Sequence, residues 1–70
     1  MDRVALQIIA VEVALSNHGD FLKHMANAWL TADILNKSLL EEAWANLVAR
    51  YDLAEEYAKA IKEHRGEYEV

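Results

Sequence analysis

The stretch that decides the fold is residues 4–15, VALQIIAVEVAL, in which only Gln7 and Glu12 are polar. It is rich in β-branched residues, so a buried strand is one interpretation. However, it is about twice as long as a typical strand of about 5–6 residues. Neither set of alternate positions is uniformly polar, as a half-exposed strand would require. Residues 4–15 therefore predict a helix.

Polar residues around this helix leave it with two apolar faces. On a helical wheel, Arg3 and Gln7 share one side, while Glu12 and Ser16 lie nearly opposite. A helix that is apolar on two faces is usually buried on both. Either the chain covers one face and the other forms an interface, or the helix lies at the centre of its own neighbours. The sequence leaves both arrangements open.

Glycine and aspartate divide the remainder of the chain, which contains no proline. The clearest break is at residues 17–20, where Gly19 can adopt the left-handed conformation that ends a helix. Asp20 can then accept backbone N–H bonds at the start of the next helix, and Asp33 can do the same before Ile34. These residues predict two short connections between helices.

A third break is expected at Asp52, which is followed three residues later by Glu55 in the pattern of a capping box. Gly66 is expected to end the last helix. The chain is thus predicted to be a single all-α domain, residues 1–70, a small bundle of about four short helices. The expected helices are 2–17, 20–32, 34–50 and 53–65, and 67–70 are expected to form a frayed tail.

The later helices carry apolar stripes at helical spacing, which predict core positions. They comprise Phe21, Leu22, Met25, Ala26, Ala28, Trp29 and Ala32 in the second helix, Leu35, Leu39, Leu40, Ala43, Trp44, Leu47, Val48 and Tyr51 in the third, and Leu53, Tyr57, Ala60, Ile61, His64 and Tyr68 in the fourth.

A chain of 70 residues without cysteine lacks the usual covalent supports of a small domain. At this size folding buries only about 60% of the unfolded surface, and one core rarely supplies more than roughly 3–5 kcal/mol. Disulfides and thiolate zinc sites are excluded. We therefore predict that self-association completes the bundle. The interface candidates are Ile8, Val11, Val13, Trp44, Tyr57 and Tyr68.

The charge balance disfavours two classes of partner. A net charge of −5 argues against generic binding to nucleic acid or to an anionic membrane, because both depend on basic surface. The apolar segment 4–15 is shorter than the roughly 20 residues that span a bilayer, and removing it as a signal peptide would leave too little chain to fold. A cytoplasmic protein is expected, which the lack of cysteine fits.

The sequence contains no recognisable catalytic or metal-binding arrangement. His18, His24 and His64 have no metal-ligand spacing, and His24, one turn after Asp20, is more typical of a surface ion pair than of a ligand. No serine or threonine lies in a glycine-rich turn that would expose a nucleophile. An enzyme is therefore not expected, nor is a metal or another cofactor.

Residues 21–51, FLKHMANAWLTADILNKSLLEEAWANLVARY, resemble short uncharacterised proteins of tailed bacteriophages. The shared features are Phe21, Ala26, Ala28, the Ala32-Asp33 pair, Asn36, the leucines at 39 and 40, Leu47 and Arg50-Tyr51. This resemblance implies a viral accessory protein that acts in the cytoplasm of the host cell.

The resulting functional hypothesis is a non-enzymatic phage-type accessory protein that acts by binding, such as an anti-defence inhibitor of a host protein. One alternative is an oligomer that sequesters a small nucleotide between its subunits. Another is a purely structural assembly subunit. Candidates for ligand binding are the basic residues Arg3, Lys23, Arg50 and Arg65.

Overall fold

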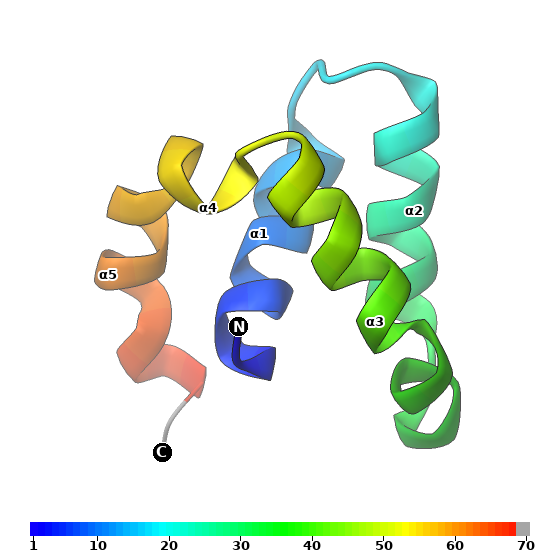
Figure 1. The fold of residues 1–70 in the computed structure, drawn as a ribbon. Helices are drawn as coiled ribbons and strands as arrows, with labels where there is room; N and C mark the ends of the chain where they lie inside the picture. Colours follow the sequence, from blue (N-terminus) through cyan, green and yellow to red (C-terminus); the bar gives the residue numbers. More distant parts are fainter. Residues whose placement is uncertain (69–70) are drawn as a thin grey trace.

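A computed structural model describes residues 1–68 of the chain and builds them almost entirely from helices. Helices account for 84% of the described residues, and none of these residues forms a strand. The helices are α1 (Arg3–Leu15), α2 (Asp20–Thr31), α3 (Ile34–Arg50), α4 (Leu53–Glu56) and α5 (Ala58–Tyr68) (Figure 1). The all-α prediction is confirmed, with five helices in place of about four.

The extra helix comes from a break in the segment expected at 53–65. The α4 helix ends at Glu56, and α5 begins after Tyr57. Gly66 does not end α5, which continues to Tyr68, because its backbone is not in the left-handed region and the helix passes through it. Residues 67 and 68 of the expected frayed tail are therefore helical, and 69–70 lie outside the described residues.

Asp33 begins α3 as predicted from the sequence. Its side chain accepts a hydrogen bond from the backbone N–H of Asn36 at 2.9 Å, so it satisfies one of the free donors of the first turn. Asp2 caps α1 in the same way, with 2.8 Å between its Oδ1 and the backbone nitrogen of Ala5. These two caps fix where both helices start.

Two other predicted caps are wrong. Asp20 is the first residue within α2, and Gly19 occupies the N-cap position with φ at 96° and ψ at 164°. Gly19 therefore has a positive φ, but it is not left-handed and does not end α1, which stops at Leu15. Asp52 makes no side-chain capping bond, because it turns the chain in the left-handed conformation with φ at 54°. Aspartate is a suitable residue for capping a helix, but the backbone of Asp52 forms the turn between α3 and α4.

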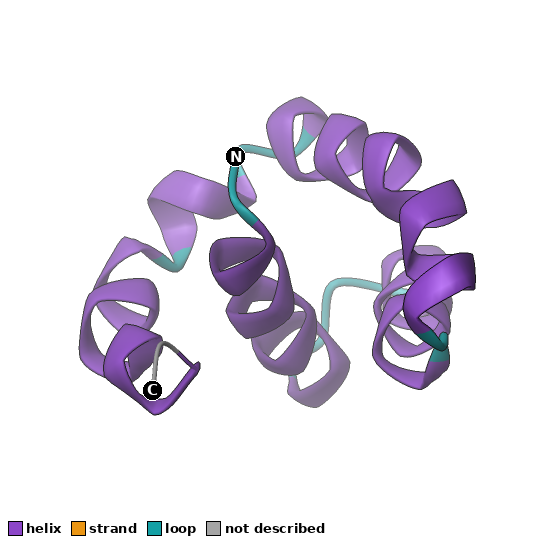
Figure 2. Ribbon diagram, turned by 90° about the horizontal axis from the view of Figure 1, so that it is seen from below, coloured by secondary structure: helices purple, strands orange, loops and turns teal. Residues whose placement is uncertain are grey.

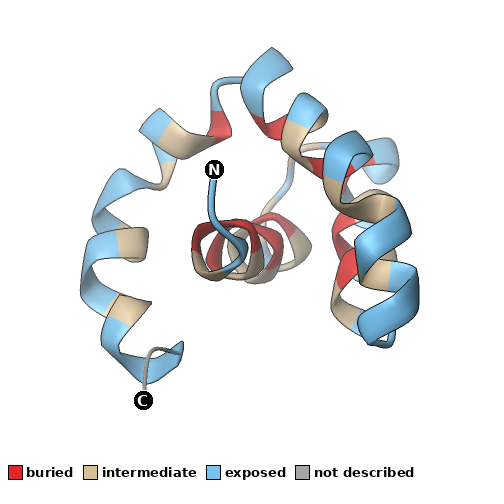
Figure 3. Cartoon of the chain, turned by 60° about the horizontal axis from the view of Figure 1, so that its bottom comes forward, coloured by how far each residue is buried: buried red, intermediate tan, exposed pale blue. Residues whose placement is uncertain are grey.

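The first helix lies at the centre of the molecule and packs against each of the other four helices. Figure 2 shows it between the α4 and α5 side and the α2 and α3 side, and Figure 3, which looks along it, shows the others in an arc around it. The central arrangement is therefore the one that the structure adopts. The buried core consists of Ala5, Leu6, Ile8, Ile9, Ala10, Val13, Leu22, Ala26, Trp29, Trp44, Val48 and Leu53.

Both tryptophans are buried, but they differ in hydrogen bonding. The indole N–H of Trp44 donates to the backbone carbonyl of Leu6 at 3.1 Å, which joins α3 to the central helix. The indole N–H of Trp29 is equally buried and meets no acceptor among the described residues. The ammonium group of Lys37 lies 5.4 Å from the centroid of the Trp29 ring and covers it from α3.

Polar contacts at the surface connect α1 to the outer helices. Arg65 of α5 donates to Asp2 at 3.1 Å. The pKa of the Asp2 carboxyl is lowered, first by the backbone N–H of Ala5 and then by the Arg65 side chain. The Lys37 ammonium donates to Gln7 at 3.2 Å, so α3 is also joined to α1.

Candidate functional site

The most prominent surface feature is a group of aliphatic side chains at the start of α3. Ile34, Leu35 and Leu39 are 77%, 78% and 79% exposed. In Figure 1 the N-terminal turns of α3 extend below the first turn of α1. Gln7 and Arg3 of α1 contact Lys37 and Ser38 on one side of these turns. Leu35 and Leu39, which lie four residues apart and so share a side of the helix, are on the other side. The sequence placed Leu35 and Leu39 in the core, and this prediction is wrong because both lie on the side of α3 that faces away from its contacts with α1.

A hollow of about 420 Å³ lies beside these side chains, between the end of α2 and the start of α3. Leu39 stands at its edge, since it lines the hollow and is also 79% exposed. The lining is mostly small or aliphatic and consists of Ala28, Thr31, Ala32, Asn36, Leu39 and Leu40. An aliphatic side chain and a hollow of apolar character are therefore adjacent on one surface.

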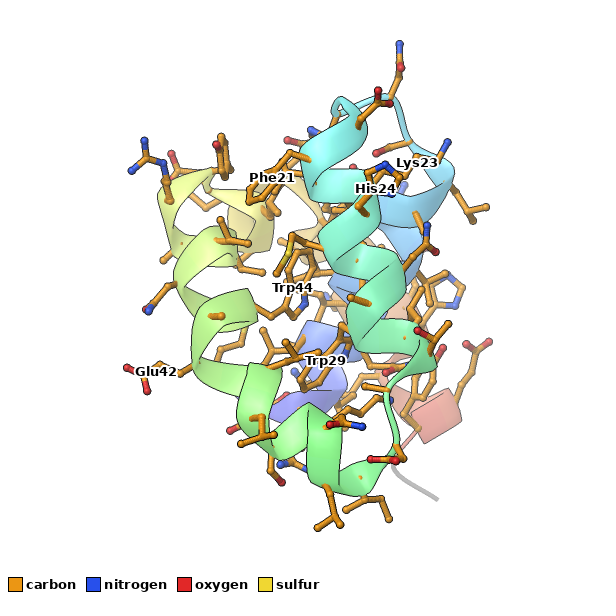
Figure 4. The ribbon with its side chains drawn as sticks, turned by 90° about the vertical axis from the view of Figure 1, so that its right-hand side faces the viewer. Phe21, Lys23, His24, Trp29, Glu42 and Trp44 are labelled. Atoms are coloured by element: carbon orange, nitrogen blue, oxygen red, sulfur yellow. The ribbon has the colours of Figure 1, made fainter. Side chains whose placement is uncertain are left out.

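The same side of the molecule carries further exposed apolar residues toward the other end of α2. Phe21, another predicted core residue, is 58% exposed, and in Figure 4 it lies between α2 and α3. Trp44 and Trp29 lie between the same two helices but are buried beneath the surface. Glu42 points away from α2, so it lies at the margin of this side. We call the surface formed by Phe21, Ala28, Ala32, Leu35, Leu39 and Ala43 the α2–α3 face.

The interface candidates from the sequence lie elsewhere, and several are inaccessible. Ile8, Val13 and Trp44 are 2%, 0% and 0% exposed, so they belong to the core of the single chain and offer no surface to a partner. Their burial follows from the central position of α1 and from the packing of α3 against it. Val11 is partly buried, and Tyr68 is 44% exposed.

Val11 and Tyr68 line a second hollow, of about 160 Å³, between α1 and α5. Its lining also includes Ile8, Glu12, His64 and Glu67. His64 Nδ1 lies 3.0 Å from Glu67 Oε2, so two of the polar groups that line this hollow are paired with each other. Within residues 1–68, no three histidine or acidic side chains come together in a way that could hold a metal ion.

Tyr57, the remaining interface candidate, takes part in a contact within the chain. Its hydroxyl lies 2.6 Å from His18 Nε2, and the two rings meet edge to face with their centroids 5.8 Å apart. Glu56 Oε2 lies 2.8 Å from the same nitrogen. Burial raises the pKa of the Tyr57 hydroxyl. The cluster joins the loop after α1 to the break between α4 and α5, so its evident role is structural.

The four basic candidates for ligand binding are on four different helices. Arg3 is paired with Glu41 and also donates to Ser38 at 3.1 Å. Arg65 is bonded to Asp2, and the Arg50 guanidinium lies 5.9 Å from the Tyr51 ring centroid. Lys23 is exposed on α2. The structure thus spreads the four over separate helices and pairs Arg3 and Arg65 with carboxylates of the chain itself.

Sequence reasoning missed the exposure of Ile34, Leu35 and Leu39 because it assigned one broad stripe of α3 to the core. One signal was present. Ile34 and Leu35 follow the Asp33 cap directly, and Leu39 and Leu40 are adjacent, so the first half of α3 is apolar on more than one side. The neighbours of α3 lie on only part of its circumference, so it cannot bury all of these sides.

Comparison of the chain with protein-family models, with curated proteins and with solved structures finds no match. None of the described helices is both long enough and apolar enough to cross a membrane. The α2–α3 face is therefore the main structural clue to function.

Proposed function

We propose that this protein is a non-enzymatic binding module and that the α2–α3 face is its contact surface for another polypeptide. The observation that carries the proposal is the 77–79% exposure of Ile34, Leu35 and Leu39, three neighbouring aliphatic residues on one helix end. Such grouped exposure beside a hollow is typical of interaction sites, whereas single exposed apolar residues are ordinary.

The exposure of these three side chains leaves hydrophobic stabilisation unused in the single chain. Full burial of a leucine or isoleucine side chain stabilises by about 1.5–3 kcal/mol, so three at nearly four-fifths exposure leave roughly 3.5–7 kcal/mol unrealised. That amount is comparable to the roughly 3–5 kcal/mol that a core of this size supplies. A partner that covers the α2–α3 face would recover much of it.

In the phage setting that the resemblance of residues 21–51 implies, a module of this kind would act by covering part of a host protein, without turnover. An inhibitor of host defence is one such role. The mainly apolar lining of the hollow supports a polypeptide partner better than a phosphate-bearing ligand, which requires basic groups.

The test is site-specific photo-crosslinking in bacterial cells that produce the chain. A photoreactive phenylalanine analogue replaces Leu39 on the face or, as the matched control, Lys59 on α5, whose side chain is 89% exposed. We expect protein adducts from position 39 and few from position 59. Equal labelling at the two positions, or no adduct at position 39, would overturn the proposal.

A further inference from the structure

We infer that the polypeptide on the α2–α3 face is a second copy of this chain, bound about a two-fold axis with the two α3 helices antiparallel. This inference rests on the proposed function, because it names the occupant of the same face. It also relocates the self-association expected from the sequence, since the α1 residues that were assigned to the interface, Ile8 and Val13, are buried.

The α2–α3 face carries both a projecting side chain and a hollow, so two copies of it are complementary in shape. Leu39 projects from the surface and stands at the edge of the hollow of about 420 Å³. In a two-fold interface the same patch occurs on both subunits, so a residue close to the axis meets the surroundings of its own counterpart. An axis that passes beside Leu39, on the side of Ala43, therefore brings the two Leu39 side chains close to each other and to the edges of both hollows. A dry cavity of about 150 Å³ already admits a benzene-sized group, so the space is sufficient.

A large and a small residue follow each other along the exposed side of α3. Ala43 is exposed and lies one turn beyond Leu39, toward the middle of the helix. When two copies run antiparallel about an axis between these residues, Leu39 of one packs beside Ala43 of the other. A large side chain opposite a small one permits close packing of the two helices.

Charge at the ends of α3 supports the same orientation. Asp33 is the exposed N-cap of the helix, and Arg50 is its exposed last residue. An antiparallel arrangement centred between Leu39 and Ala43 brings Asp33 of each copy toward Arg50 of the other. A parallel arrangement would instead bring together like charges at both ends. Glu42 points away from α2 and so stays at the margin.

The size of the molecule sets the share of its surface that a stable pair would cover. A standard specific interface buries about 800 Å² on each partner. This is roughly one sixth of the 4672 Å² surface of the chain, and two of the three molecular dimensions are 27 and 25 Å. An interface of standard size would therefore cover a large part of one side of the molecule.

The experiment measures association by sedimentation velocity over low micromolar to near-millimolar concentration. We expect the unmodified chain to form dimers and Leu39→Glu to raise the dissociation constant by about 30-fold or more, as loss of a central contact does. The matched control is Leu15→Glu, which changes a leucine of 81% exposure on α1 by the same charge. The control should associate like the unmodified chain.

Orientation is tested with cysteines, of which the chain has none of its own. Leu39→Cys and Ala43→Cys variants are mixed and oxidised, and the mixed disulfide should form in excess of either homodisulfide. A chain that stays monomeric throughout the range would overturn the inference. So would equal weakening by Leu39→Glu and Leu15→Glu, or crosslinking without preference for the mixed pair.

Failure of this inference can be distinguished from failure of the proposed function. Photo-adducts from position 39 with proteins other than this chain, together with a monomeric chain in sedimentation, would overturn the second copy and leave the binding face. Loss of helix content in Leu39→Glu would show that Leu39 belongs to the core, which would overturn both.

Discussion

The contrast between the two buried tryptophans leads to a stability prediction. Trp44→Phe and Trp29→Phe remove the same atoms from equally buried sites, so the loss of apolar contact and the cavity left behind are similar. Trp44→Phe also removes the 3.1 Å bond to the Leu6 carbonyl, whereas Trp29→Phe removes an N–H that has no acceptor among the described residues. The Trp44 variant should therefore be the less stable of the two.

The size of the difference follows from the two hydrogen-bonding situations. The bond of Trp44 contributes about 0.5–1.5 kcal/mol, and the buried, unpaired N–H of Trp29 costs about 1–3 kcal/mol. Part of this is offset because phenylalanine binds the Lys37 ammonium less well than tryptophan does, by roughly 0.5 kcal/mol. We expect Trp44→Phe to have the lower free energy of unfolding by about 1–4 kcal/mol.

The assay is urea unfolding followed by far-ultraviolet circular dichroism at one fixed protein concentration, because association would add to apparent stability. Each variant retains one tryptophan, so fluorescence provides a second probe of whether unfolding is two-state. Equal losses of stability, or a larger loss in Trp29→Phe, would refute the assignment of the Trp44 hydrogen bond and the unpaired Trp29 donor.

The remaining predictions concern turns, caps and pH. Gly19→Ala should destabilise by about 1 kcal/mol, because φ there is 96°, whereas Gly66→Ala should stabilise by about 0.5–1 kcal/mol, because the position is helical and open; thermal melts of the pair should shift in opposite directions. Asp33→Ala should cost about 1 kcal/mol through loss of its cap, and Asp33→Asn much less, as measured by urea midpoints. Burial makes the pKa of the Tyr57 hydroxyl higher in the folded chain than in the unfolded chain, where it is about 10. The stabilisation linked to this shift is fully present below the unfolded pKa and is lost as pH rises through the folded pKa. Tyr57→Phe should flatten that alkaline decline in melting temperature, and an unchanged profile would contradict the assignment.

Local chemistry allowed the sequence by itself to determine much of the secondary structure. Apolar periodicity predicted an all-α chain, and the expected range 34–50 of the third helix matches the observed bounds of α3. The Asp33 cap was also predictable, because it depends on the chemistry of one residue and its immediate backbone. Asp52 shows the limit of this reasoning, since the turn between α3 and α4 places its backbone in a conformation that precludes capping.

Only the tertiary structure decided which apolar faces are covered. The two apolar faces of α1 were visible in the sequence, but its central position depends on contacts with all four other helices. Leu39 and Trp44 belong to the same predicted stripe of α3, yet one is 79% exposed and the other 0%. Periodicity describes how apolar residues are spaced around a helix and not which of its sides the neighbouring helices cover. The exposure of Leu39, and with it the proposed binding face, is therefore decided by the packing alone.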